Sequence, residues 1–364
     1  MSILNLVRPD LLNGQNYIPG GENARYRSHA NELPWAPVTM DGHNLNYYPN
    51  IGLQIDLQKQ LAKRYQINSD QIILTRGSDD GIDLTTRLFL TAGKDAFMQF
   101  PPTFPMYAFY VRLQQAELIE CPLDIKTNFR LSLDQIKNNW KPNCKVIMFC
   151  SPNNPTGNLV DLNLIAKTCE LYANQSIIVV DEAYIEFANA PSATTLLGQF
   201  ENLIVLRTLS KACGMAGLRL GCIIAQSPII QAFNKIIAPY AIATPGMELA
   251  KRALNNSDWF TQTIERIKSS RAWVIKKFAE NPIIEKIYPT ETNFILIQTR
   301  FSKQLTTWLA HHGIAVRDFP STSLLHDHLR ITVGHDEQNQ LLIDALSSFN
   351  ADVAGLNYEK DFIY

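Results

Sequence analysis

The stretch Thr208-Leu209-Ser210-Lys211-Ala212-Cys213-Gly214-Met215-Ala216-Gly217-Leu218-Arg219 lies between two short apolar segments, each of which predicts a β-strand. It contains one lysine, Lys211, among hydroxyl and small residues. A buried lysine tends to lose its proton, and the neutral amine can form a Schiff base with a carbonyl group. Thr208, Ser210 and Arg219 are suited to hold an anion beside that amine, because an arginine fork matches the geometry of phosphate. The alternative is an exposed lysine in an ordinary loop.

The composition is that of an ordinary globular protein that is large enough for two domains. The chain has 364 residues, of which 46% are hydrophobic and 18% are charged. Its 33 Lys and Arg residues nearly balance its 34 Asp and Glu residues, so no overall field directs it to nucleic acid or to an anionic membrane. The six cysteines lack the spacing of a zinc site and predict buried free thiols in a reducing compartment. With no visible signal peptide and no long apolar run, we expect a cytoplasmic protein without a membrane span.

Short apolar segments alternate with amphipathic ones from residue 72 onward. The expected strands are 72–75, 96–100, 117–121, 146–150, 177–180, 203–206 and 222–225, and the helices between them include 81–90, 105–115 and 162–172. This alternation predicts a largely parallel sheet that is covered by helices on both faces. Ligands bind outside the carboxyl ends of such strands. Because Ser78, Asn154, Asp181 and Lys211 each follow an expected strand end, we predict one composite site there.

The periodicity divides the chain into three parts. Residues 1–50 are rich in proline and large aromatic residues, which predicts an arm that packs against the rest of the protein. Residues 51–247 form the expected large domain, which begins with a helix over 53–65. Residues 248–364 form a smaller α+β domain, and the arm is expected to fold against it. Its expected elements are a long helix over 248–280 that breaks near Asn255-Asn256, strands 293–298, 314–317 and 329–333, and helices 302–312 and 336–349.

Two strand ends carry residues that allow two interpretations. Ser78 and Asp79 open a helix after a strand, where backbone N–H groups and the helix dipole form an anion cradle; an ordinary helix cap is the alternative. Asp181 follows a buried strand, where a carboxylate is costly unless it pairs with a cation such as a pyridinium N–H. Tyr184, three residues later, is placed to reach a neighbouring ring oxygen. For Asp181 too, the alternative is a helix cap.

Four further positions are candidates for ligand contacts. Asn154, in the turn Asn153-Asn154-Pro155-Thr156-Gly157, is expected to donate its amide to a ligand oxygen. Phe104 follows another strand end and can stack on a planar ring, although an aromatic residue belongs more often to the core. Arg330 lies inside an apolar strand, so it must meet either a substrate carboxylate or phosphate, or a structural ion partner. Arg317 allows the same interpretation more weakly, because an aspartate follows it.

The histidines do not indicate a metal site. His326-Asp327-His328 is the densest group, but the sequence supplies no further ligand at a suitable spacing. The segment is expected to be a loop, where histidines are usually solvated. We therefore predict no bound metal.

Taken together, six segments resemble the fold-type I pyridoxal phosphate (PLP) aminotransferases. They are Gly77-Ser78-Asp79-Asp80, Pro101-Pro102-Thr103-Phe104, Asn153-Asn154-Pro155-Thr156-Gly157, Asp181-Glu182-Ala183-Tyr184, Ser210-Lys211 with Arg219 eight residues on, and Leu329-Arg330-Ile331-Thr332-Val333-Gly334. Within that superfamily the chain is most similar to the histidinol-phosphate aminotransferases, through Asn31-Glu32, Asn46-Tyr47-Tyr48-Pro49 and the Arg317/Arg330 pair. The resemblance covers residues 30–345 and implies an α/β fold, with a large domain around a mostly parallel sheet and a smaller C-terminal α+β domain.

The resemblance implies a role for each residue near the cofactor ring. Lys211 would hold PLP covalently and shuttle a proton as general base and acid. Asp181 would keep the ring nitrogen protonated, so that the ring can accept electrons. Asn154 and Tyr184 would bind the ring oxygen, and Phe104 would stack on the ring.

The resemblance also implies the contacts at both ends of the cofactor. The cofactor phosphate would be bound by the backbone amides of Ser78 and Asp79 and by Thr208, Ser210 and Arg219. A tyrosine that matches Tyr48 would reach that phosphate from the partner subunit, which implies a homodimer with the arm packed partly on the partner. The substrate would be bound by Arg330, with Arg317, Tyr17 and Asn31 at the same end.

The implied reaction is amino transfer between L-histidinol phosphate and 2-oxoglutarate in histidine biosynthesis. An aromatic amino acid aminotransferase and a PLP decarboxylase of a phosphorylated amino acid are the alternatives. Two departures lie near the substrate: Leu33 stands where the family usually has asparagine, and Phe104 where this enzyme commonly has tyrosine. A PLP-binding transcription regulator would need a helix-turn-helix module, which the proline-rich residues 1–50 do not resemble.

Overall fold

The computed structural model describes residues 2–12, 39–40 and 43–349. A seven-stranded sheet forms its centre, with the strand order β3-β9-β8-β7-β6-β4-β5. The strands are β3 (Ile72–Thr75), β4 (Ala96–Gln99), β5 (Glu117–Glu120), β6 (Cys144–Cys150), β7 (Ile177–Asp181), β8 (Leu203–Thr208) and β9 (Gly221–Ala225). Only β9 runs antiparallel to its neighbours, so the prediction of a largely parallel sheet is confirmed.

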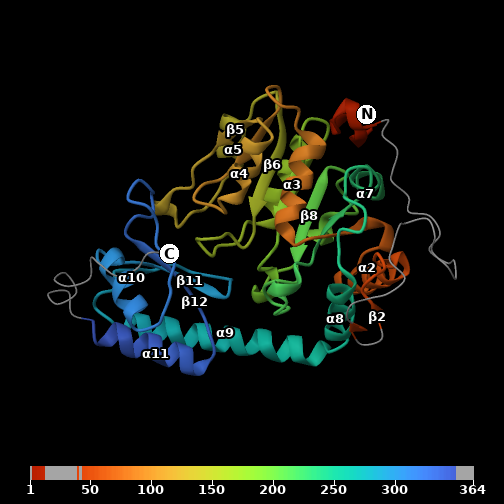
Figure 1. Ribbon diagram of the computed structural model, residues 1–364. Helices are drawn as coiled ribbons and strands as arrows, with labels where there is room; N and C mark the ends of the chain where they lie inside the picture. The colour runs from red at the N-terminus through yellow and green to blue at the C-terminus, as the bar shows by residue number, and fades with distance from the viewer. Residues whose placement is uncertain (1, 13–38, 41–42, 350–364) are drawn as a thin grey trace.

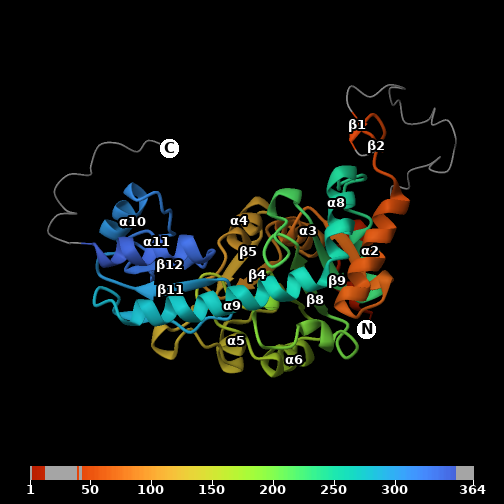
Figure 2. The same cartoon turned by 90° about the horizontal axis from the view of Figure 1, so that it is seen from below.

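Helices cover both faces of this sheet (Figure 1, Figure 2). One apolar cluster includes residues of α2 (Ile51–Tyr65), α5 (Leu133–Asn139), α6 (Leu162–Leu171) and α8 (Thr244–Leu254). The other includes residues of α3 (Ser78–Phe89), α4 (Met106–Leu113) and α7 (Ser227–Phe233). Strand residues alternate between the clusters: Ile178 and Val180 belong to the first, and Ile177 and Val179 to the second. Both faces are therefore buried, which explains the continuous apolar strands.

A smaller antiparallel sheet forms the C-terminal domain. It consists of β10 (Lys286–Ile287), β11 (Phe294–Gln298) and β12 (His328–Thr332). It packs with α10 (Ser302–His311), α11 (Asp336–Ser347) and the C-terminal part of α9 (Ser257–Ala279) in a separate cluster. Figure 2 shows α9 running from beside the large domain to this domain. The expected helix break is confirmed, because Asn256 caps α9 by accepting the N–H of Trp259.

Three expectations about the domains need correction. The strand expected over 314–317 is a single bridge between Arg317 and Arg330, so this segment adds only one residue pair to the sheet edge. The large domain does not end at residue 247, because α8 packs on α2 and contributes to the first cluster. The beginning of the arm also differs, since Ile3, Leu6 and Val7 are buried in the second cluster of the large domain and not on the small one. Two short strands, β1 (Thr39–Met40) and β2 (His43–Asn44), lie within the part of the chain expected to form the arm.

The cysteines are as predicted and one histidine is not. All six cysteines are buried and unpaired in disulfides. His328 was expected in a solvated loop but lies buried on β12. Its Nε2 is 3.0 Å from the hydroxyl of Tyr288, and burial lowers the pKa of His328 to about 4. No described helix is both long enough and apolar enough to cross a membrane.

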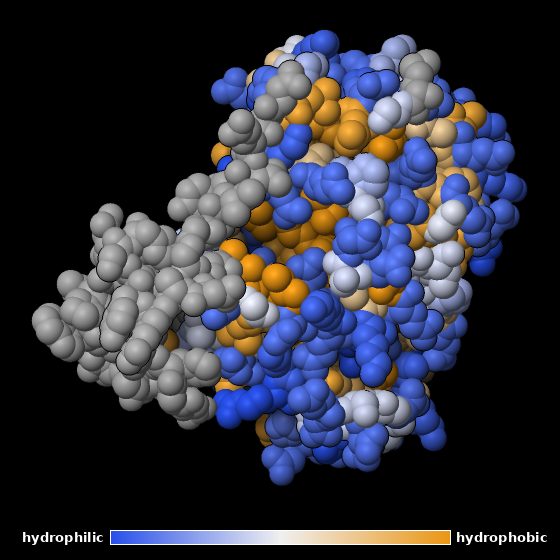
Figure 3. Space-filling model, turned by 90° about the vertical axis from the view of Figure 1, so that its right-hand side faces the viewer, coloured by the Kyte–Doolittle hydropathy of each residue, from blue (hydrophilic) through white to orange (hydrophobic). Residues whose placement is uncertain are grey.

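Exposed apolar residues gather on the face that carries α2 and α8. Leu45, Tyr47, Tyr48, Ile55 and Leu249 each expose about two fifths of their surface or more. Figure 3 shows this side of the molecule, with apolar side chains visible between polar ones. A surface of this kind is typical of an interface.

Candidate active site

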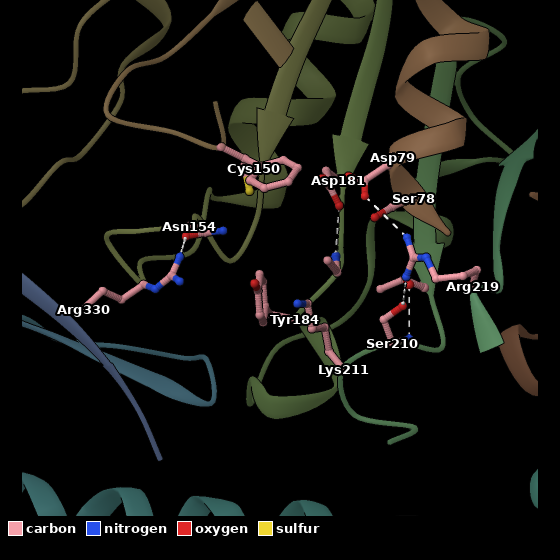
Figure 4. A pocket seen from close by; sticks show the side chains of 13 residues that line it. Ser78, Asp79, Cys150, Asn154, Asp181, Tyr184, Ser210, Lys211, Arg219 and Arg330 are labelled. Atoms are coloured by element: carbon pink, nitrogen blue, oxygen red, sulfur yellow. Dashed lines mark hydrogen bonds and ion pairs between the residues drawn. The ribbon is translucent and has the colours of Figure 1, made fainter. Parts of the chain in front are cut away.

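The carboxyl ends of the parallel strands surround a cavity of about 210 Å³. It is lined by Ser78, Asp79, Phe104, Cys150, Asn154, Asp181, Ala183, Tyr184, Thr208, Ser210, Lys211, Arg219 and Arg330. The lining residues follow β3, β4, β6, β7 and β8, and Arg330 comes from β12 of the small domain (Figure 4). The predicted composite site is therefore one cavity, located where the two domains meet.

One end of the cavity is rich in hydrogen-bond donors. Arg219 donates from Nη1 to Ser210 Oγ over 3.3 Å, and its Nη2 lies 3.5 Å from Asp79 Oδ2 (Figure 4). The backbone N–H of Ser210 donates to Thr208 Oγ1 over 3.1 Å. Gly77 precedes α3 with a φ of +84°, and a Cβ atom there would lie 2.9 Å from Arg219 Nη2. Glycine thus lets the guanidinium approach the N-terminus of α3, which suits an anion.

Asp181 is a buried carboxylate in the wall of the cavity. Its Oδ2 accepts the hydroxyl of Tyr107 over 2.8 Å, and its Oδ1 accepts the backbone N–H of Ala183 over 3.1 Å. Burial raises the pKa of Asp181 to about 6, although both hydrogen bonds lower it. Within the described chain, this carboxylate forms no ion pair with a lysine or arginine. A cation that enters the cavity would therefore find a desolvated anion.

Lys211 and Tyr184 lie on the opposite side of the cavity from Asp181 (Figure 4). Lys211 Nζ is 5.6 Å from the centroid of the Tyr184 ring, which packs edge-to-face on Phe294. Partial burial lowers the pKa of Lys211, and the nearby positive charge of Arg330 adds to this effect. The lysine is more exposed than the sequence predicted, because its side chain opens into a cavity that solvent reaches. The pKa of its ammonium group is nevertheless lowered, as expected.

Arg330 brings a positive charge from the small domain to the asparagine turn. Its Nη1 donates to Oδ1 of Asn154, and the two side chains point toward each other in Figure 4. Its Nε is buried and has no hydrogen-bond partner. Burial lowers the pKa of Arg330, and the charge of Arg317 adds to this effect. A half-buried guanidinium with an unused donor is suited to bind an anion.

Two of the predicted residues that the structure describes, Tyr48 and Arg317, do not line the cavity. Tyr48 stacks on Tyr240 with ring centroids 4.6 Å apart. Arg317 is exposed and pairs with Arg330 only through the backbone, so it contributes charge near the site without lining it. Tyr17 and Asn31 lie outside the described residues.

The sequence did not indicate three residues of the site. Tyr107 appears as an ordinary apolar residue of α4, and nothing in its spacing shows that it faces Asp181. Cys150 ends an apolar strand, and its lateral pairing with Asp181 follows from strand register alone. Ala183 contributes a backbone N–H. Of the three, Cys150 alone offered a signal, because it lies three residues before the asparagine turn begins.

The cavity fits a planar cofactor with a cationic ring nitrogen and a phosphate. Asp181 offers an ionisable, desolvated carboxylate for the nitrogen, and Arg219 with the N-terminus of α3 offers donors for the phosphate. Phe104 is an aromatic residue of the cavity wall, and Lys211 provides an amine whose pKa is lowered. These groups are the ones that PLP requires.

The comparisons agree with this geometry. The model of the family "Aminotransferase class I and II" matches residues 15–346. The chain is 92% identical over 364 residues, all of both chains, to histidinol-phosphate aminotransferase 1 of Legionella pneumophila (strain Philadelphia 1). It is 36% identical to histidinol-phosphate aminotransferase of Xanthomonas euvesicatoria, over 97% of this chain and 99% of the relative.

The fold also resembles solved structures. The histidinol-phosphate aminotransferase from Sinorhizobium meliloti, solved in complex with pyridoxal-5'-phosphate, aligns with a TM-score of 0.75 at 23% identity, over 87% of this chain and 88% of that chain. At this identity the likeness supports the fold alone. The sequence matches carry the assignment: the chain belongs to the class I and II aminotransferases, a family of PLP-dependent enzymes, and with its full-length relatives to the histidinol-phosphate aminotransferases.

Proposed function

We propose that this enzyme transfers the amino group between L-histidinol phosphate and 2-oxoglutarate, as a step of histidine biosynthesis. The observation that carries the proposal is Arg330, a half-buried guanidinium with an unpaired Nε opposite the phosphate-binding end of the cavity. A substrate with its own phosphate or carboxylate would satisfy that donor. The full-length likeness to histidinol-phosphate aminotransferases supports the same substrate.

The residues around the cavity would hold PLP at three points. The donors of Ser78, Asp79, Thr208, Ser210 and Arg219 would bind its phosphate. When bound, PLP supplies an electron sink that stabilises negative charge at the substrate Cα. Asp181 would hold the ring nitrogen in its protonated form, and Asn154 and Tyr184 would hydrogen-bond the ring oxygen. Phe104 would stack on the ring.

Lys211 would serve as both the covalent anchor and the proton carrier. Its lowered pKa favours the neutral amine, which can take the proton from the substrate Cα and return it as the ammonium. Tyr184 lies against the lysine and limits where its Nζ can move. Lys211→Ala should therefore abolish transamination while leaving weak cofactor binding.

Arg330 would bind the anionic group of both substrates in turn. The phosphate of histidinol phosphate and a carboxylate of 2-oxoglutarate are both acceptors for a guanidinium fork. Asn154 accepts one N–H of this fork, which fixes its orientation. Arg317 adds positive charge nearby, and Tyr17 and Asn31, outside the described residues, complete the proposed substrate end.

We further propose a cytoplasmic homodimer in which Tyr48 completes the site of the partner. Tyr48 does not line the cavity of its own chain, and it lies on the face with exposed apolar residues. Six free cysteines, all buried, agree with a reducing compartment.

Steady-state kinetics with four amino donors test the substrate. With 2-oxoglutarate as acceptor, kcat/KM should be highest for histidinol phosphate. For histidinol, which lacks only the phosphate, kcat/KM should be lower by at least about 30-fold, because a buried, charged hydrogen-bond donor then has no partner. Higher kcat/KM for tyrosine would overturn the substrate in favour of aromatic amino acids. Release of carbon dioxide from phosphothreonine would instead indicate a decarboxylase.

A further inference from the structure

Tyr107 is buried directly behind the Asp181 carboxylate. The side chain is 0% exposed, and its hydroxyl donates to Asp181 Oδ2 over 2.8 Å. Tyr107 belongs to α4, whereas Asp181 ends β7, so the bond connects two elements that are 74 residues apart in the chain. Phe104, which lines the cavity, packs edge-to-face on the Tyr107 ring with centroids 5.6 Å apart. One tyrosine thus supports both the carboxylate and the aromatic wall.

The phenol is a permanent donor in this position. Burial and the neighbouring carboxylate raise the pKa of Tyr107, so it stays protonated. The other donor to Asp181 is the N–H of Ala183, which no side-chain substitution removes. Two charged groups also affect Asp181: Asp79 opposes its ionisation and Lys211 favours it. The thiol of Cys150 and the phenol of Tyr184 lie near the carboxylate as well, and burial raises the pKa of both, so both stay neutral. Among the side chains that the structure describes, Tyr107 alone gives the carboxylate a direct hydrogen bond.

We propose that Tyr107 is a positioning residue for the reaction, which keeps the Asp181 carboxylate ionised and directed at the ring nitrogen of the cofactor. Without the hydroxyl, a buried carboxylate with one remaining donor would take up a proton more readily. A protonated Asp181 cannot stabilise a cationic ring nitrogen, so the electron sink would weaken. This role rests on the proposed use of PLP, but not on the identity of the amino donor.

A purely structural role would have different consequences. A buried hydroxyl needs some acceptor, and Asp181 could serve only to satisfy it. Loss of the hydroxyl would then lower stability equally at every pH and would leave the charge of Asp181 unaffected. The two roles therefore differ in their dependence on pH.

The first test measures binding of PLP to the apoprotein of Tyr107→Phe as a function of pH. Asp181 has a pKa of about 6, so the affinity of the wild type should fall as the pH drops through this value. In the variant the fall should begin about one to two pH units higher, because a hydrogen bond to a charged group is lost. Tyr172→Phe removes a phenol beside Trp140, away from the cavity, and should leave the profile unchanged. An unshifted profile in Tyr107→Phe would overturn the proposal.

The second test uses the apoprotein alone, by denaturant unfolding at several pH values. The folded-state pKa of Asp181 lies above its unfolded value of 3.8, so its contribution to stability is present at low pH and is lost as the pH rises through about 6. In Tyr107→Phe this loss continues to higher pH, so its stability deficit should grow as the pH rises. In an Asp181→Asn background the deficit should be independent of pH. A constant deficit in both backgrounds would leave only the structural role.

These outcomes separate the inference from the proposed substrate. If histidinol phosphate is a poor donor but the binding profile still shifts, Tyr107 retains its role in an aminotransferase of other specificity. If the wild type does not bind PLP at all, the proposed function fails first. Should Tyr107→Phe not fold, Asp181→Asn tests the same pair from the carboxylate side. The phosphate of PLP titrates near pH 6 in every variant, so the fall of PLP affinity in this region should be smaller in Asp181→Asn than in the wild type. A fall of the same size in both proteins would contradict the role of this pair.

Discussion

Arg330 shows how a single side chain joins the two domains at the site. It extends from a strand of the small domain, yet one of its N–H groups is bound by Asn154 of the large domain. Its Cζ also lies 5.2 Å from the centroid of the Phe294 ring, a favourable site for a guanidinium. Its Nε is buried and has no hydrogen-bond partner. Charge alone would not reproduce this arrangement, because only arginine offers a planar fork.

Arg330→Lys should therefore impair the enzyme although it keeps the charge. We expect kcat/KM for histidinol phosphate to fall by at least about 30-fold, the factor that corresponds to about 2 kcal/mol. Arg330→Met should lower it further, because the anion then meets no charge. Arg300→Met is a matched control, since Arg300 stacks on Phe301 and does not line the cavity. Full activity of Arg330→Lys would argue against a bidentate contact.

At the scale of elements, the asparagine turn is held from both domains. Within the large domain, the side chain of Asn153 donates to the carbonyl of Pro102 over 2.9 Å. From the small domain, the backbone N–H of Glu291 donates to the carbonyl of Gly157 over 2.8 Å. Gly157 has a φ of +80°, and a Cβ atom there would lie 2.7 Å from Cβ of Thr290. The close packing of the turn against Thr290 of the small domain therefore requires glycine at position 157.

Gly157→Ala should lower both stability and activity. The positive φ costs about 1–2 kcal/mol for alanine, and the overlap with Thr290 adds to this cost and displaces Asn154. Gly93→Ala isolates the first contribution, because Gly93 has a φ of +67° but no atom within 4 Å of the added Cβ. Denaturant unfolding of the two variants should show the larger loss for Gly157→Ala, and only that variant should lose kcat. An equal loss of stability in the two variants would mean that Thr290 moves away from the added methyl group at little cost.

A buried ion network fixes the ends of the two strands beside the turn. Arg207 on β8 pairs with Glu182 over 3.3 Å and with Glu186 over 2.7 Å, and all three side chains are buried. Its guanidinium also lies 4.4 Å from the centroid of the Tyr65 ring on α2. Glu182 follows Asp181 directly, so the network constrains the segment that carries the Asp181 carboxylate. The two carboxylates compensate the charge of the buried guanidinium, although Arg207 Nε and Glu186 Oε2 have no hydrogen-bond partner.

At the scale of the whole molecule, the site depends on how large pieces meet. The cavity opens between the domains, and the long α9 connects them (Figure 2). Residues of α9 also join a small cluster with Tyr184 and Phe294, one from each domain. The exposed apolar face of α2 and α8 leaves a further surface for a second copy of the chain.

Mixing two inactive variants tests whether Tyr48 acts across such an interface. Lys211→Ala lacks the proton carrier, and Tyr48→Ala lacks the proposed phosphate contact. If Tyr48 serves the partner, a mixed dimer contains one site with both residues intact, and random exchange should restore about a quarter of the wild-type activity. Each variant alone at the same concentration is the control. No recovery in mixed dimers, isolated through a different affinity tag on each variant, would assign Tyr48 to its own chain.

The order of strands and helices and most of the residues of the cavity follow from the amino-acid sequence alone. Ser78, Asn154, Asp181 and Lys211 could be grouped without coordinates, because the carboxyl ends of parallel strands share one edge of a sheet. Local pattern was sufficient there, since buried strands and their terminating turns are encoded within a few residues. The same pattern failed at 314–317, where an apolar segment forms only one bridge.

Contacts between side chains that are far apart in the chain become visible only in the folded protein. Sequence spacing contains no information on strand register or on helix rotation, so neither the bond from Tyr107 to Asp181 nor the one from Arg330 to Asn154 could be derived. The same holds for α8, whose hydrophobic pattern fits either domain and whose packing on α2 assigns it to the large one. The sequence thus determined which residues are available for chemistry, and packing determined the charge, exposure and partners of each, because these depend on neighbours from other elements.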